Sequence, residues 1–326
     1  MHIFDCHSDI WTDVYTRTLK GEKNIIRKYH FNKLKEGKIA GSIFVIWLDS
    51  SRLEDPYKTT MEIMDSINME LNYCQDLIFI AKSYEDIEKA LKEKKIYVFM
   101  GLEGLSSIGE NLSLIDYFYE LGFRHVSLTW NEENALATGV RGNPVRGLTP
   151  VGKEAVKKIN DNKMLLDVSH LNEKSFWDLV NITDKPFIAS HSNCKSICNV
   201  PRNLSDEQLR IIADIKGVVG INSFNQFIHK DVEKQNLNTL VQHVVHMVEV
   251  MGIDHVGIGM DYCDFIDDEV MSGFRLQETS YTKGLEDASK TYNFIREMER
   301  VGFHKDEIEK VAYKNFHRII KEILSS

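Results

Sequence analysis

The sequence predicts an α/β fold, a TIM-like (β/α)8 barrel, and this prediction rests on two observations. Short β-branched, apolar segments alternate along the chain with longer segments of helical spacing, a pattern typical of parallel strands joined by helical crossovers. There are eight such strand segments, the number that closes a TIM barrel. A doubly wound open sheet is the competing architecture. It typically carries a glycine-rich phosphate turn after its first strand, whereas this sequence reads HSDIWTD there.

The predicted strands are short and rich in Val, Ile, Leu and Phe. In chain order they span residues 2–7, 40–48, 96–103, 125–130, 164–170, 187–191, 217–222 and 255–261. The first is unusual because Asp5, His7 and Asp9 occupy alternate positions, which places them on one face of an extended segment. Polar groups on one face of an apolar strand are costly in a core, so this face is expected to contact solvent or to bind a charged ligand.

Helical segments are predicted between the strands. They span residues 56–75, 149–161, 205–215, 238–251 and 305–324. Thr149 is placed as an N-cap with Pro150 at the first helical position, and Ser205 with Gln208 three residues later forms a capping box. With only five prolines and no low-complexity tract, no linker is visible, and residues 1–326 are predicted to form one barrel domain.

Composition excludes several classes of function. The net charge of −9 argues against a nucleic-acid surface, which would need a basic stripe. No window holds 18 apolar residues without charge and no basic segment precedes the first strand, so neither a membrane span nor a signal peptide is expected. The five cysteines are odd in number and scattered, which does not indicate a disulfide framework and favours the cytoplasm.

Ionisable residues recur where predicted strands end. They are His7, Asp9, Glu103, His170, His191 and Asp261. The carboxyl ends of all strands of a TIM barrel meet at one mouth, where the active site lies. Imidazole nitrogens and carboxylate oxygens are good ligands for zinc and similar divalent ions. The sequence therefore predicts a metal site built from distant segments.

The number of candidate ligands exceeds what one four-coordinate zinc ion needs. Two ions that share a carboxylate account for them better, and Glu103 is the natural bridge. Taken singly, each residue has an ordinary explanation: His7 and Asp9 could form a hydrogen-bonded strand end, and His170 or His191 could be a core histidine. Their coincidence at strand ends favours metal. His243 with His246, and Cys194 with Cys198, are weaker candidates, and Asp5 either orients His7 or hydrogen-bonds within the barrel.

These motifs resemble the membrane dipeptidase (renal dipeptidase) family of zinc peptidases, in its bacterial form, over nearly the whole chain. The matching pieces are HSD (7–9), GLEG (101–104), GLTPVGKEAVKKIN (147–160), LLDVSHL (165–171), FIASHSN (187–193), PRNLSDEQL (201–209) and HVGIGMDY (255–262). The resemblance implies a TIM-like barrel with two Zn²⁺ per chain. It also implies a homodimer.

The resemblance assigns a role to each residue of the predicted site. His7 and Asp9 are expected on one zinc ion, His170 and His191 on the other, and Glu103 on both. Arg202 is expected to hold the carboxylate of the substrate, since a guanidinium fork suits a carboxylate. Asp261 is expected to handle protons at the scissile bond, and Gly257 and Gly259 to leave room for the ligand on the inward face of the last strand.

One substrate-binding position departs from the family. Many relatives carry a histidine after the residues LT, and this chain has Trp130 there. An indole donates only through its N–H and cannot replace a charged imidazolium.

The expected activity is hydrolysis of dipeptides, including those with a D-residue at the C-terminal position, by a hydroxide that bridges the metals. The alternatives are a binuclear amidohydrolase that acts on small cyclic amides or acyl amino acids, and a barrel without catalysis.

Overall fold

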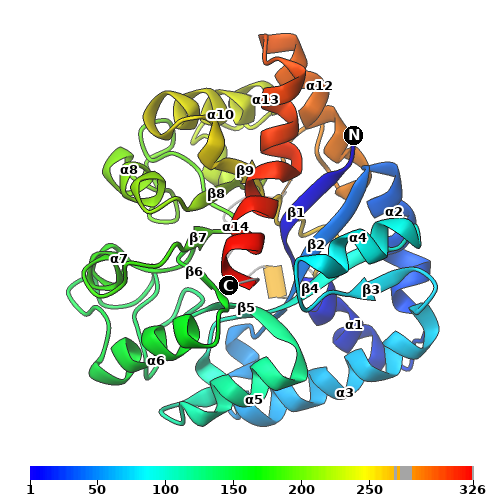
Figure 1. Ribbon diagram of the computed structural model, residues 1–326, viewed down its shortest axis with the longest axis vertical. Coiled ribbons are helices and arrows are strands. Elements are labelled where there is room, and N and C mark those ends of the chain that lie inside the picture. The colour runs from blue at the N-terminus through cyan, green and yellow to red at the C-terminus, as the bar shows by residue number, and fades with distance from the viewer. Residues whose placement is uncertain (268–269, 272–280, 325–326) are drawn as a thin grey trace.

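The computed structural model describes residues 1–267, 270–271 and 281–324. Parallel strands form a closed barrel, and helices surround it (Figure 1). The strands are β1 (Ile3–Ser8), β2 (Ile39–Trp47), β3 (Ile78–Ile80), β4 (Ile96–Glu103), β5 (Phe123–Ser127), β6 (Leu165–Asp167), β7 (Ile188–Ala189), β8 (Val218–Ile221) and β9 (Val256–Ile258). The predicted (β/α)8 barrel is confirmed.

The barrel closes between β2 and β4. The sheet runs in the order β2-β1-β9-β8-β7-β6-β5-β4-β3, and β2 also pairs with β4 from Gly41↔Tyr97 to Trp47↔Glu103. Strand β3 therefore lies outside the closed ring, beside the first half of β4. The sequence prediction missed β3 because three residues between two helices are too short to show a strand period.

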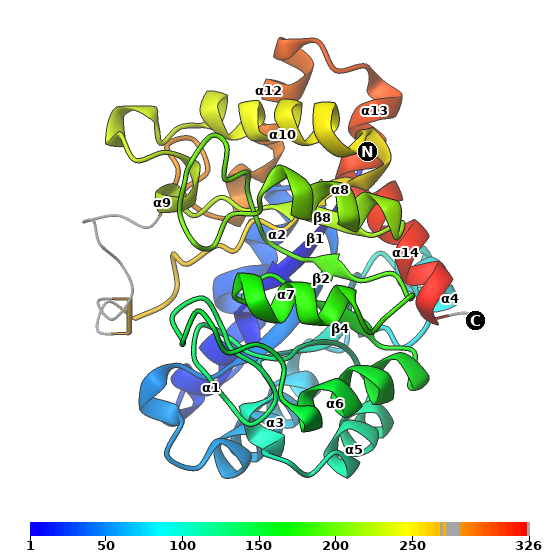
Figure 2. The same cartoon turned by 90° about the vertical axis from the view of Figure 1, so that its left-hand side faces the viewer.

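The helices cover the outside of the ring, and α6, α7 and α8 follow one another across the face turned to the viewer in Figure 2. The helices are α1 (Ile10–Leu19), α2 (Phe31–Glu36), α3 (Pro56–Cys74), α4 (Glu85–Lys92), α5 (Ser113–Leu121), α6 (Pro150–Asp161), α7 (Glu173–Val180), α8 (Asp206–Asp214), α9 (Asn225–Ile228), α10 (Leu237–Met251), α12 (Thr291–Val301), α13 (Lys305–Glu309) and α14 (Asn315–Leu324). None of the helices in the described part of the chain combines the length and apolar character needed to cross a bilayer.

Both predicted helix caps are present. The Thr149 hydroxyl accepts the Gly152 N–H at 2.9 Å, and Ser205 and Gln208 form the reciprocal capping box of α8. The predicted helix over 305–324 is interrupted, since a π-helical turn at Lys310–Lys314 separates α13 from α14. A hydrophobic pattern does not reveal such a turn, because one inserted residue changes the helical spacing only locally.

Helix α14 closes the barrel at the end opposite the predicted site, and it crosses the middle of the ring of strands in Figure 1. Its buried Phe316 packs with Phe4 and Tyr97 from inside the barrel. A Cβ atom on Gly257 would lie 2.3 Å from the Phe316 ring, and one on Gly259 would lie 1.7 Å from the Ser190 carbonyl oxygen. The expectation that these glycines leave room for a ligand is wrong, because protein atoms fill that space.

Four helices end in a lysine with a left-handed backbone. Lys38, Lys94, Lys163 and Lys216 follow α2, α4, α6 and α8 with φ between 55° and 64°. Lys163 occupies the position after the cap of α6, where Met164 N donates to Ile159 O at 3.1 Å. This is the Schellman motif, in which glycine is the usual residue because a Cβ atom disfavours positive φ. Helices α5 and α12 instead have a left-handed glycine at the carboxyl-terminal cap, Gly122 and Gly302.

Replacing Lys163 with glycine is therefore expected to stabilise the protein. Removal of the Cβ strain outweighs the greater entropy of glycine in the unfolded chain, and the free energy of unfolding should rise by roughly 0.5–1 kcal/mol. Denaturant titration measures this change. Lys163→Ala is the control, since it removes the same charge but keeps the Cβ atom. Equal stability of the two variants would contradict the strain argument.

Candidate metal centre and active site

The residues of the predicted site gather at the carboxyl end of the barrel. His7 lies in β1 and Asp9 directly after it, whereas Glu103 is the last residue of β4. His170 and His191 follow the short strands β6 and β7 by three and two residues. All five are buried, with exposed fractions of 5% or less. Barrel geometry thus brings together side chains that lie far apart in the sequence.

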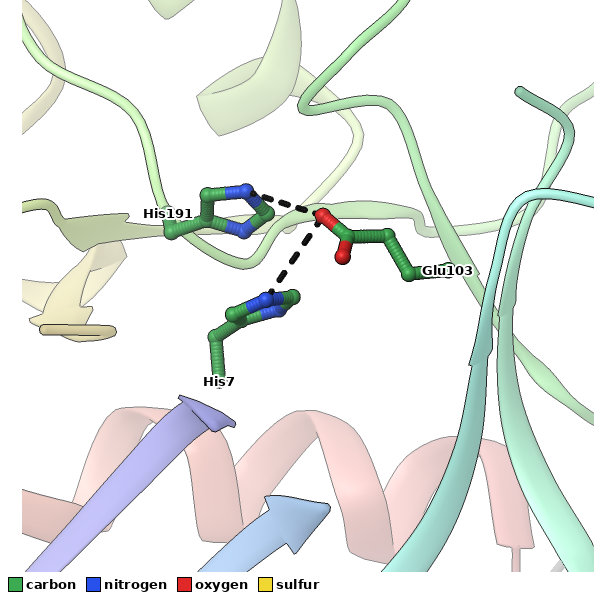
Figure 3. Close-up of side chains that lie close together, drawn as sticks. All are labelled: His7, Glu103 and His191. Atoms are coloured by element: carbon green, nitrogen blue, oxygen red, sulfur yellow. Dashed lines mark ion pairs between the residues drawn. The ribbon is translucent and has the colours of Figure 1, made fainter. Parts of the chain in front are cut away.

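Glu103 lies at the centre of the cluster. Its Oε1 atom is 2.7 Å from His170 Nε2, 3.5 Å from His191 Nε2 and 3.6 Å from His7 Nε2. Figure 3 shows the His7 and His191 rings approaching this oxygen from different strands. Burial raises the pKa of the Glu103 carboxyl well above its usual range, while the His7 charge opposes this shift. One carboxylate oxygen of Glu103 therefore lies near three imidazole rings from separate segments of the chain.

Two further carboxylates, those of Asp9 and Asp261, lie near His7. Its Nε2 atom lies 3.8 Å from Asp9 Oδ2 and 3.9 Å from Asp261 Oδ1. Burial lowers the pKa of His7, but the carboxylates of Glu103, Asp9 and Asp261 outweigh it and raise the pKa to about 10. The acidic groups around His7 therefore favour a positive charge at this point of the site.

On the opposite side of the site, the surroundings of His170 and His191 disfavour the protonated imidazolium form. Burial, together with the nearby charges of Arg202 and His7, lowers the pKa values of His170 and His191 well below the usual range. His170 Nδ1 contacts Asn131 Oδ1 at 3.0 Å, and His191 Nδ1 contacts Ser190 Oγ at 2.6 Å. A proton on each Nδ1 satisfies both contacts and leaves both Nε2 atoms with a bare lone pair.

These groups fit a metal. The two Nε2 atoms of His170 and His191 lie only 2.9 Å apart, so one cation can bind both when each carries a lone pair. Among the residues that the structure describes, neither ring nitrogen of the fully buried His7 nor Asp9 Oδ1 has a hydrogen-bond partner. Buried polar atoms are costly without a partner, and divalent ions take such nitrogen and carboxylate donors.

Arg202 is held beside this cluster. Its guanidinium donates to the Ser169 carbonyl oxygen and, at 3.2 Å, to the His191 carbonyl oxygen. The same group lies 3.4 Å from His170 Nε2. Two carbonyl groups near strand ends thus fix a positive charge against the predicted metal ligands.

A pocket opens above the cluster, and its walls combine aromatic side chains with charged and polar ones. It is lined by Asp9, Trp47, Glu103, Trp130, Asn131, His170, Arg202, Phe224, Phe227, Asp261, Cys263 and Ile266. Trp130 forms part of one wall, with its ring centroid 5.2 Å from that of Trp47 and 6.1 Å from that of His170. A site that combines apolar walls with a few convergent polar groups suits a small polar molecule.

Asp261 has a left-handed backbone, with φ of 57°. Such a conformation is costly for a residue other than glycine, and strain of this kind tends to occur at functional positions. Asn222 Nδ2 donates to Asp261 Oδ2 at 3.0 Å, while Asn222 Oδ1 accepts the Phe224 N–H and thereby fixes the amide. Burial raises the pKa of Asp261 to about 6, against the opposing charge of His7.

The weaker candidates have structural roles. His243 Nδ1 accepts the Cys194 N–H at 3.1 Å, and the Cys194 and Cys198 thiols are buried against backbone carbonyls. Asp5 accepts backbone N–H groups from Met260 and His7, so it hydrogen-bonds within the barrel and does not touch the His7 ring.

Sequence reasoning missed several polar residues of the site. They are Asn131, Asp167, Ser190 and Asn222. Position alone offered a signal for two of them, because Ser190 directly precedes His191 and Asp167 is three residues before His170.

Comparison with known proteins decides the family. The family model for membrane dipeptidases, peptidase family M19, matches residues 1–325. The chain belongs to the membrane dipeptidase family. Membrane dipeptidases are metallopeptidases, so this membrane dipeptidase is an enzyme that hydrolyses dipeptides and uses a divalent metal.

The relatives that the chain is similar to include a named dipeptidase. The dipeptidase tcpJ of Claviceps purpurea is 25% identical over 99% of this chain and 75% of its own length. An uncharacterised protein of Klebsiella pneumoniae, from the pqqA 5′ region, is 32% identical over 74% of this chain and 87% of its own length.

Solved structures show the same fold. A metallopeptidase of Rhodobacter sphaeroides, liganded with a phosphinate mimic of the dipeptide L-Ala-D-Ala, superposes with a TM-score of 0.87 at 22% identity over 99% of both chains. A second crystal structure, of a metallopeptidase named dipeptidase AC, has a TM-score of 0.88 at 23% identity and covers 100% of this chain and 99% of its own.

Proposed function

We propose that this membrane dipeptidase works with two zinc ions held by His7, Asp9, Glu103, His170 and His191. The observation that carries the proposal is the position of Glu103, whose single oxygen lies within 2.7–3.6 Å of three imidazole Nε2 atoms. Nitrogen and carboxylate donors favour zinc among the divalent ions of similar chemistry. When bound, two such ions supply a water-derived nucleophile at neutral pH and positive charge opposite the carbonyl oxygen of the scissile bond.

The side chains of the pocket bind and orient the dipeptide. Arg202 donates hydrogen bonds to the free carboxylate of the substrate, because its fork offers paired donors for a planar anion. A carboxylate bound beside the cluster admits only one residue on the C-terminal side of the scissile bond, which agrees with the dipeptide substrates of the family. Trp47 and Trp130 supply an apolar wall that excludes water from the reacting bond.

Asp261 moves the proton. Asn222 holds Oδ2, which leaves Oδ1 facing His7 and the centre of the site. The Asp261 carboxylate takes a proton from the attacking water and passes it to the amine nitrogen that leaves. In the metal-free chain, burial raises the pKa of the Asp261 carboxyl above its usual range, which favours its exchange of protons near neutral pH.

We expect the purified full-length protein to bind two zinc ions per chain and to hydrolyse L-Ala-L-Ala and L-Ala-D-Ala. Chelation should abolish turnover, and added zinc should restore it. The comparison substrates are N-acetyl-L-alanine and a small cyclic amide, which lack the free amine or the free carboxylate of a dipeptide. Turnover of a comparison substrate, with both dipeptides left intact by the zinc-loaded protein, would favour an amidohydrolase instead.

We further propose a homodimer in the cytoplasm. Family membership supports the dimer, which sedimentation equilibrium measures. All five cysteines lie in the described part of the chain and are free thiols, a state typical of a reducing compartment.

A further inference from the structure

A buried hydrogen-bonded chain lies behind His191, on the side away from the pocket. Its centre is Asp167, the last residue of β6, which is 1% exposed. Asp167 Oδ1 accepts the Ser169 and Ser190 backbone N–H groups at 3.0 Å and the Ser169 hydroxyl at 2.7 Å. Asp167 Oδ2 accepts the Ser190 hydroxyl and His125 Nε2, the latter at 3.1 Å.

Five donors to one carboxylate determine where the protons lie. Burial opposes the charge on Asp167, but the His125 contact and the Ser190 bonds prevail, and its pKa lies well below the usual range. An ionised carboxylate only accepts hydrogen bonds, so Ser190 must give its single hydroxyl proton to Asp167. The Ser190 oxygen can then only accept from His191 Nδ1, which lies 2.6 Å away. His191 therefore carries its proton on Nδ1.

His170 and His191 differ in the groups that their Nδ1 atoms contact. His170 Nδ1 contacts the neutral amide oxygen of Asn131, whereas His191 Nδ1 connects through one hydroxyl to a full negative charge. A carboxylate behind a metal-bound imidazole fixes its tautomer and raises its basicity.

We propose that Asp167, acting through the Ser190 hydroxyl, is a positioning residue that holds the His191 proton on Nδ1 and presents Nε2 to the metal. The consequence for metal affinity rests on the proposed function, whereas the position of the proton does not. Neither residue touches the substrate pocket.

Two variants change this chain in different ways. Ser190→Ala removes the connecting hydroxyl and leaves four donors on Asp167. Asp167→Asn keeps the shape but can turn an amide N–H toward Ser190, so the hydroxyl would donate to His191 Nδ1 and move the ring proton to Nε2. Ser42→Ala is the matched control, because Ser42 is equally buried in a barrel strand and, among the described residues, its hydroxyl hydrogen-bonds to the Ile43 carbonyl alone.

Two measurements on the full-length chain test the proposal. Competition with a chromophoric chelator should show about 10- to 100-fold weaker zinc binding for Ser190→Ala and Asp167→Asn, and an unchanged affinity for Ser42→Ala. Histidine ¹⁵N shifts of the metal-free protein should place the His191 proton on Nδ1 in the wild type and move it toward Nε2 in Asp167→Asn.

The two readouts separate the possible failures. A wild-type His191 proton on Nε2, or one that stays on Nδ1 in Asp167→Asn, would overturn the proposal. Unchanged zinc affinity in both variants would overturn the effect on the metal. If the wild type bound no zinc, the proposed function would fail, and the ¹⁵N shifts would still decide the position of the proton. If Ser190→Ala did not fold, Asp167→Asn would decide both points.

Discussion

Glu103→Gln should lower kcat/KM for dipeptides by about 10³-fold or more and should reduce the zinc content below two ions per chain. The substitution keeps the shape of the side chain but removes the charge that lies between three imidazoles. An amide has one acceptor oxygen and cannot bridge two cations as a carboxylate does. Steady-state kinetics and elemental analysis of the same preparation measure both effects.

Although activity and zinc content should fall in Glu103→Gln, the thermal stability of the metal-free variant should not. Burial raises the pKa of Glu103, so the ionised carboxylate is unfavourable at this position of the folded protein when no metal is present. The melting temperature of metal-free Glu103→Gln should therefore equal or exceed that of the metal-free wild type. Glu132→Gln is the control, since Glu132 lies nearby but accepts a hydrogen bond from Ser106 outside the cluster. Full turnover by Glu103→Gln would eliminate the bridge.

Arg202→Lys should raise KM for dipeptides by about 10²-fold while kcat changes much less. The guanidinium fork is replaced by a point charge, so paired binding of the substrate carboxylate is lost in the ground state and the transition state alike. The lysine variant is preferable to Arg202→Ala, because alanine also leaves the Ser169 and His191 carbonyl groups without their donors.

An amidated dipeptide separates binding from structural damage. It carries no C-terminal charge, so the wild type should use it poorly and Arg202→Lys should change its kcat/KM by less than about 10-fold. Equal losses for the free and the amidated dipeptide would mean that Arg202 supports the structure of the site and does not bind the substrate carboxylate.

The sequence was sufficient to predict which charged residues would meet. His7, Glu103, His170 and His191 follow apolar segments, and the topology of a parallel barrel sends such residues to one end. The alternation of His7 and Asp9 around a strand end was visible in three letters of sequence. These predictions need only the position of each polar residue relative to its apolar segment, and the sequence shows that position directly.

The supporting contacts could not be predicted in the same way. Ser190 meets Asp167 because β6 and β7 pair with Asp167 opposite Ile188. The sequence of either strand alone does not determine this register. Asn222 meets Asp261 for the same reason, since they follow the neighbouring strands β8 and β9. Gly257 was misassigned because the sequence does not show that Phe316, 59 positions later, packs against it.

The most direct test of a shared two-metal centre is anomalous diffraction at the zinc edge, from crystals of this protein grown with zinc. The account predicts two peaks roughly 3.5–4 Å apart, both bonded to the Glu103 carboxylate, with His7 and Asp9 on one and His170 and His191 on the other. A single peak, or peaks away from Glu103, would contradict it.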